Sequence, residues 1–222
     1  MHPAQPKILR NPILLPLALV LALAIGACSP AASTPEANAS TQTADQPEWL
    51  AALDAPHRML FDAGTPNAVA LVHTLNYYES WKAVAGVEDD DIDAVVTFYG
   101  GTTFHGLDDS MWSKYGLGEV MDQRDAAGDP YTINPWRTAP LFAGAEMAPA
   151  GIEALADRGT TFLLCNNALT FLSGQVAAAR GLDAQTVYED MKAHMLPSVT
   201  LVPAMVVAID QAQQAGISYH KQ

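Results

Sequence analysis

The sequence predicts an α/β domain built on a single, mostly parallel sheet with helices on both faces. Short runs rich in β-branched and aromatic residues alternate along the chain with segments whose apolar residues recur every three to four positions. Glycine or proline stands at most boundaries between the two kinds of segment. Strands that alternate with helices form parallel sheets, because each helix carries the chain back to the edge where the next strand begins.

The first part of the domain is expected to contain two strands and one long helix. Residues 57–62, with Met59, Leu60 and Phe61 among them, predict a short first strand that ends at Ala63-Gly64. A helix follows, with Pro66 in its first turn and Gly86 at its end, because the apolar residues between them recur at helical spacing. Residues 92–98 carry the β-branched and aromatic side chains of a buried strand, which ends at Gly100.

An irregular insertion follows over about residues 102–150. It contains one short helical piece, residues 109–115, and then turn sequences such as Gly128-Asp129-Pro130. Long segments of this kind in compact domains usually serve a function. We expect the insertion to be either a lid over a site or a contact between copies of the chain.

Regular alternation returns at Gly151 and continues to the end of the sequence. Glycine or proline closes most of these elements, as helix and strand ends require. The expected elements are a helix over 152–158, a strand over 160–164, helices over 168–180 and 184–196, a strand over 199–202, a helix over 204–215 and a strand over 217–219.

The N-terminus is expected to be an export signal spanning residues 1–27. Lys7 and Arg10 provide a short positive stretch, and residues 13–27 carry no charge. This apolar run is shorter than the roughly 20 residues that a membrane-spanning helix needs. The signal therefore indicates export and not a transmembrane anchor.

The end of this signal, Ile25-Gly26-Ala27-Cys28, resembles a bacterial lipobox, in which the cysteine receives a lipid and becomes the first residue of the mature protein. The resemblance implies a lipoprotein tethered to the periplasmic face of a membrane through Cys28. Ser29, in place of an acidic residue, favours the outer membrane over the inner one by resemblance to Gram-negative lipoproteins. The alternative is an ordinary secretory signal that leaves Cys28 as a free thiol.

Composition divides the remaining chain into a tether and one domain. Residues 28–47 have almost no bulky apolar side chains and are expected to form a flexible tether, whereas residues 48–222 suit a single domain with a full core. The chain carries 24 acidic and 11 basic residues, and two of the basic ones lie in the leader. This balance excludes a surface that binds nucleic acid or anionic lipid headgroups. The lipid on Cys28, and not surface charge, would therefore hold the protein at the membrane.

Cys165 is the only cysteine of the expected domain, so it cannot form a disulfide within it. It stands where a strand is expected to end and a helix to begin. Unpaired N–H groups at a helix start favour the thiolate, the reactive form of the side chain, which fits a persulfide carrier or a redox-sensitive thiol. The alternative is a small apolar residue that plugs the end of a buried strand.

Two further candidates should lie near Cys165, because ligands of parallel sheets bind beyond the carboxyl ends of the strands. His105 is a candidate base or metal ligand, with a solvated loop histidine as the alternative. Asp62 is a candidate to orient His105 or to bind a ligand, with capping of the following helix as the alternative. No His-x-x-x-His or Cys-x-x-Cys spacing is present, so we expect no metal site and no cofactor.

Over roughly residues 57–219, the order of elements resembles the DsrE/DsrF-like family, small α/β proteins that include subunits of bacterial sulfur-relay complexes. The segments that carry the resemblance are Val95-Val96-Thr97-Phe98-Tyr99-Gly100-Gly101 and Thr160-Thr161-Phe162-Leu163-Leu164-Cys165-Asn166-Asn167-Ala168. In relay members a cysteine just after a strand accepts sulfane sulfur as a persulfide. Cys165 looks equivalent to that cysteine.

The export signal and the insertion depart from this family, whose relay members work in the cytoplasm. Any sulfur donor or acceptor protein of this chain must therefore differ from theirs. Together, the resemblance and the export signal imply a periplasmic carrier or sensor of sulfane sulfur, and we expect it to form a homo-oligomer. The alternative is a non-catalytic binding or assembly module in which Cys165 is structural. A hydrolase is disfavoured, because no nucleophile-elbow motif is present.

Overall fold

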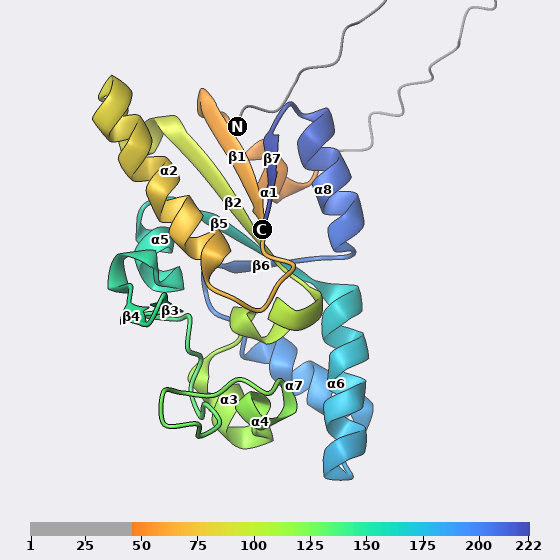
Figure 1. The fold of residues 1–222 in the computed structure, drawn as a ribbon. Coiled ribbons are helices and arrows are strands. Elements are labelled where there is room, and N and C mark those ends of the chain that lie inside the picture. Colours follow the sequence, from red (N-terminus) through yellow and green to blue (C-terminus); the bar gives the residue numbers. More distant parts are fainter. Residues whose placement is uncertain (1–45) are drawn as a thin grey trace, which may run out of the picture. The chain divides into compact units, whose positions relative to one another are not determined.

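The computed structural model describes residues 46–222 (Figure 1). The predicted signal (1–27), lipid attachment at Cys28 and most of the predicted tether (28–47) fall on residues 1–45 and lie outside the described residues. In the described part of the chain, no helix combines the length and the apolar character needed to cross a bilayer.

A five-stranded sheet with the order β6-β5-β2-β1-β7 forms the centre of the domain. Every neighbouring pair in this sheet is parallel, so the predicted α/β class with a mostly parallel sheet is confirmed. The strands are β1 (His57–Asp62), β2 (Ile92–Phe98), β5 (Thr161–Cys165), β6 (Val199–Val202) and β7 (Ser218–Lys221).

Helices cover both faces of the sheet, as predicted, and bury two separate cores. Side chains alternate between the faces along each strand, so Leu164 enters one core while Leu163 and Cys165 enter the other. Figure 1 shows α2 and α8 on opposite sides of the sheet. The first core lies under α2 (Val69–Ala85), α5 (Ile152–Asp157), α6 (Asn166–Arg180) and α7 (Ala184–Ala193); the second lies under α1 (Glu48–Ala51) and α8 (Met205–Gln214).

Two predicted helix ends are confirmed in detail. Gly86 and Gly181 adopt left-handed conformations with φ of 68° and 67° and end α2 and α6. Glycine tolerates this conformation because it has no Cβ. The N-terminus of α6 differs from the prediction: the helix begins at Asn166 and not at residue 168, directly after the last residue of β5.

The insertion is more ordered than its turn-rich sequence predicted. It opens with a 3-10 helix (Gly100–Gly106), and the expected helical piece forms α3 (Asp109–Tyr115). The further elements are α4 (Leu117–Val120), a small hairpin of β3 (Leu141–Phe142) and β4 (Ala145–Glu146), and a 3-10 helix (Ala148–Ala150). A shorter 3-10 helix (Asp89–Asp91) precedes β2.

Close backbone contacts at two glycines hold the insertion together. A Cβ on Gly118 would lie 2.3 Å from the carbonyl oxygen of Tyr131. A Cβ on Gly151 would lie 2.4 Å from the carbonyl oxygen of Thr138. Neither separation is possible for real atoms, so both positions require glycine for the chain to fold back at this distance.

Candidate functional site

Five side chains form a row along the carboxyl edge of the sheet, on the face of the second core. Asp62 at the end of β1 pairs in register with Thr97, and Leu60 pairs with Tyr219 on the same face. Phe98 pairs with Leu164, so the next residues along the two strands, Tyr99 and Cys165, are neighbours. We call this set the edge row: Tyr219, Asp62, Thr97, Tyr99 and Cys165.

Asp62 is the buried acceptor of the edge row, with 2% of its surface exposed. Its carboxylate accepts hydrogen bonds from the Tyr219 hydroxyl and, at 3.3 Å, from Thr97 Oγ1. Thr97 Oγ1 in turn accepts the backbone N–H of Ala63 at 3.2 Å. Asp62 does not cap the following helix, because the N-cap residue of α2 is Ala68. The capping alternative is therefore wrong.

Both tyrosines of the edge row are held in the neutral form by their surroundings. Burial, followed by the hydrogen bond to Asp62, raises the pKa of Tyr219 to about 12. Burial, followed by the nearby Asp62 carboxylate, raises the pKa of Tyr99 well above its ordinary value of 10.

Cys165 ends β5 and is 7% exposed. Its Sγ accepts the backbone N–H of Met205, the first residue of α8, at 3.3 Å. The sulfur therefore lies at the starts of two helices, because α6 begins at the next residue, Asn166. Helix starts present unpaired N–H groups, and the Met205 N–H is the one that reaches this sulfur.

His105 lies away from Cys165, on the other side of the sheet. The residues that flank it, Phe104 and Leu107, belong to the first core, whereas Cys165 belongs to the second. His105 is fully buried, and its ring stacks on Trp136 with centroids 3.6 Å apart and planes 6° apart. The expectation that His105 shares a crevice with Cys165 is therefore wrong, and so is the alternative of a solvated loop histidine.

The hydrogen bonds around His105 fix its tautomer. Asn134 Nδ2 donates to the carbonyl oxygens of His105 and Leu107 at 2.8 and 2.9 Å, so Asn134 Oδ1 must be the acceptor that faces His105 Nδ1 at 3.3 Å. Nδ1 therefore carries the proton. The other nitrogen, Nε2, lies 3.0 Å from Gln123 Nε2 and must accept from it.

Burial lowers the pKa of His105 from 6.5 to about 3, against a smaller opposing effect of the Asn134 hydrogen bond. With a neutral ring and both nitrogens bonded to amides, His105 has no free atom with which to act as a base or a metal ligand. Its role is to fasten the insertion, through Asn134 and Gln123, to the 3-10 helix after β2. Sequence reasoning missed this role because His105 stands in a turn-rich stretch that gave no sign of burial.

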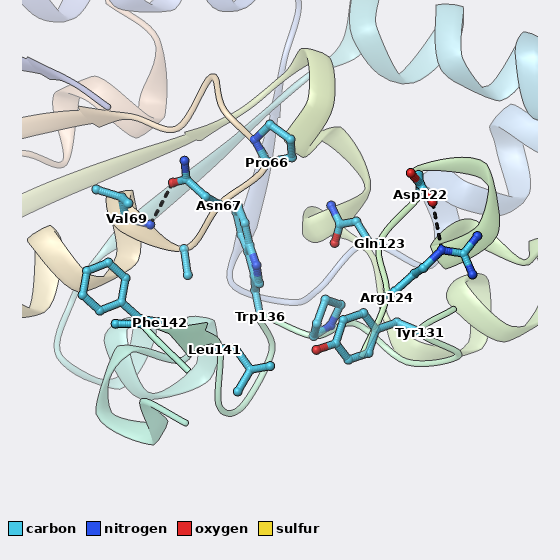
Figure 2. Close-up of a pocket in the computed structure, with 13 residues that line it drawn as sticks. Pro66, Asn67, Val69, Asp122, Gln123, Arg124, Tyr131, Trp136, Leu141 and Phe142 are labelled. Carbon is cyan, nitrogen blue, oxygen red and sulfur yellow. Dashed lines mark hydrogen bonds and ion pairs between the residues drawn. The ribbon is translucent and has the colours of Figure 1, made fainter. Parts of the chain in front are cut away.

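A hollow of about 480 Å³ lies between the loop from β1 to α2 and the insertion (Figure 2). We call it the insertion pocket. Pro66 and Asn67 line it from the loop, and Gln123, Trp136 and the β3–β4 hairpin line it from the insertion. It lies beyond the carboxyl end of β1, where parallel sheets commonly bind ligands. The sequence predicted that the insertion serves a function, as a lid or as a contact between copies of the chain.

The described residues contain no group of three or more His, Cys, Asp or Glu side chains placed to hold a metal ion. Thr97, Tyr99 and Tyr219 are the edge-row members that sequence reasoning missed. Tyr99 had a usable signal, because it continues the alternation of Val95 and Thr97 just past the end of a strand. Tyr219 had none, because its contact with Asp62 joins positions 157 residues apart.

No family model matches the chain, and no curated protein matches it. A search of solved structures finds a protein of unknown function from Methanobacterium thermoautotrophicum. The two chains are 18% identical, the match covers 75% of this chain and 99% of that one, and the TM-score is 0.36. The neighbour has no known activity to compare with the edge row or the insertion pocket.

Proposed function

We propose that this chain is an exported lipoprotein that carries or senses sulfane sulfur as a persulfide on Cys165. The observation that carries the proposal is the position of Cys165 Sγ, which accepts the Met205 N–H at the starts of two helices. The resemblance to the DsrE/DsrF-like family supports the same chemistry. Asp62 and Tyr99 belong to the proposed site, and His105 does not.

The loading step transfers one sulfur atom without a cofactor. The Cys165 thiolate attacks the outer sulfur of a donor such as thiosulfate and forms a new S–S bond. The S–S bond of the donor breaks, and sulfite leaves with the electron pair. In unloading, an acceptor thiolate attacks the outer sulfur of the persulfide, and the Cys165 thiolate is the leaving group.

Asp62 is proposed as a positioning residue for this step. Its carboxylate accepts a hydrogen bond from the Tyr219 phenol and raises the pKa of Tyr99. Tyr99 and Cys165 each follow a residue of the Phe98–Leu164 register pair. The carboxylate therefore keeps the phenol next to Cys165 in its neutral form. The Met205 N–H remains the donor to the sulfur itself, so it stabilises the negative charge before loading and after unloading.

The location of the protein and its partners are part of the same proposal. Lipid on Cys28 would tether the domain to the periplasmic face of a membrane, with the outer membrane favoured. The partners would be a sulfur donor or acceptor protein and further copies of the chain. Cys28→Ser should release the protein from the membrane fraction, and a chain that stays there would contradict the tether.

The test of sulfur loading uses the full chain with Cys28→Ser, so that Cys165 is the only thiol. The protein is incubated with thiosulfate or polysulfide, and its intact mass is measured. We expect a gain of one sulfur atom that dithiothreitol removes and that is absent when Cys165→Ser is added. No gain from either donor, together with no alkylation of the native protein, would overturn the proposal.

The low exposure of Cys165 favours a second candidate, a non-catalytic binding or assembly module. Its sulfur shares the second core with Leu163, Val202 and Met205, which is also the environment of a cysteine that only packs. Under this alternative Cys165→Ala changes stability but no sulfur chemistry. Failure of the loading test would therefore transfer the search for function to the insertion pocket.

A further inference from the structure

The insertion pocket has an aromatic wall formed by Trp136, Tyr131 and Phe142, of which Trp136 is fixed in place. Trp136 is 5% exposed, with one face of its ring stacked on His105 and its backbone N–H donated to Asn134 Oδ1 at 3.1 Å. Tyr131 and Phe142 line the same hollow from other parts of the insertion. In Figure 2, these aromatic rings and Leu141 surround the pocket on the side of the insertion. Aromatic surfaces of this kind suit a flat ring.

The neutral His105 ring dictates which end of the Gln123 amide is available to a ligand. His105 Nε2 can only accept, so Gln123 must turn its Nε2 toward the ring, at 3.0 Å. Gln123 lines the pocket, and within the described chain its Oε1 is left as a free acceptor. A buried histidine that never contacts a ligand thus sets the hydrogen-bonding character of the pocket.

Asn67 presents the opposite polarity from the loop between β1 and α2. Its Oδ1 accepts the backbone N–H of Val69, at 3.1 Å, in the first turn of α2. The Nδ2 group is therefore left as a donor within the described chain. Figure 2 shows Asn67 and Gln123 on the two sides of Trp136, so a donor and an acceptor flank the aromatic wall.

The charged residues of the pocket neutralise each other. Arg124 donates from Nε to Asp122 Oδ1 at 2.9 Å and from Nη1 to the carbonyl oxygen of Gly128 at 3.1 Å. These are the two formally charged side chains among the residues that line the hollow. The lining therefore carries no net charge and gives no preference for an ionic ligand.

We propose that the insertion pocket binds a small, uncharged, planar ring that carries both a carbonyl and an N–H on its rim, as a pyrimidine lactam does. The ring packs against the aromatic wall, its carbonyl accepts from Asn67 Nδ2, and its N–H donates to Gln123 Oε1. The volume of about 480 Å³ lies in the range of small-molecule sites. This site is separate from the proposed sulfur chemistry and does not depend on it.

Isothermal titration calorimetry of the full-length chain tests this proposal with three probes. Uracil offers the carbonyl and the N–H, 1,3-dimethyluracil keeps the carbonyls but lacks the N–H, and benzoate is planar but charged. We expect saturable binding of uracil, and binding of the other two that is weaker by about tenfold or more. Absence of uracil binding, or equal binding of all three probes, would overturn the proposal.

Two matched variants place the binding in this pocket. Asn67→Asp keeps the acceptor for the Val69 N–H but removes the donor, and we expect it to weaken uracil binding by about tenfold while the fold is retained. Asn76→Asp makes the same chemical change at an exposed position of α2 outside the pocket, and we expect no effect. Equal affinities in Asn67→Asp and the unaltered chain would locate the ligand elsewhere and refute the assignment.

Discussion

Acid is expected to destabilise this protein through His105, because only the unfolded chain can protonate it. In the folded protein, burial holds the pKa of His105 near 3, whereas in the unfolded chain the pKa returns to 6.5. Between these two pH values the unfolded state binds the additional proton. The free energy of unfolding therefore falls as the pH falls through this window. Well above pH 6.5 the histidine is neutral in both states, and no stability is lost through it.

The size of this effect follows from the two pKa values. Well inside the window, each pH unit costs about 1.4 kcal/mol. The first part of the range, near pH 6.5, contributes less because the unfolded histidine is only partly protonated there. Lowering the pH from 7 to 5 should therefore remove about 2 kcal/mol of stability through this one side chain.

Urea unfolding at several pH values between 7 and 5 measures the loss, and His105→Phe isolates it. The phenylalanine keeps a ring against Trp136 but cannot titrate, so its pH-dependent loss should be smaller by about 2 kcal/mol than in the unaltered protein. Equal losses with and without His105, or an NMR titration of His105 in the folded protein with a midpoint near 6.5, would refute the reasoning.

Two further predictions concern the insertion and the edge row. Gly118→Ala should lower the free energy of unfolding by more than about 2 kcal/mol, because its Cβ would meet the Tyr131 backbone. Gly174→Ala, in open space on α6, should raise the free energy of unfolding by up to about 1 kcal/mol. Thermal unfolding measures both changes, and equal shifts in the two variants would contradict the packing argument. Asp62→Asn should return the pKa of Tyr219 from about 12 toward its ordinary value of 10, because it removes a charge that raises it. Ultraviolet titration of tyrosinate measures this change, and an unchanged titration would mean that burial alone sets the pKa.

The strands and long helices of this fold could be predicted because local signals agree with the tertiary structure. Residues 92–98 were expected as a buried strand and form β2, and Gly86 was expected to end the helix that it ends. The short helix α1 was missed, because its single buried residue, Leu50, follows a stretch of tether-like composition. The order within the insertion was missed because it depends on contacts such as that of Gly118 with Tyr131.

Residues of the candidate site could be predicted only where their position at the end of a strand determines where they lie in the fold. Asp62 and Cys165 were placed at the carboxyl edge because each ends an apolar run, and the structure puts both in the edge row. His105 was misplaced, because the sequence does not reveal which face of the sheet the residues after β2 cover. Its amide partners, Asn134 and Gln123, stand 29 and 18 residues further along the chain, beyond the reach of any local pattern.

The contact between Asp62 and Tyr219 gives the edge row a place in the order of folding. It joins β1 to β7 across 157 residues, so the chain loses much conformational entropy before this hydrogen bond can form. Local helices and the β1–β2 pair can assemble earlier, while Asp62 still lacks a partner from β7. The pKa of Tyr219 thus reports whether β7 has joined β1. In a folding intermediate that lacks this pairing, Tyr219 should titrate with its ordinary pKa of 10.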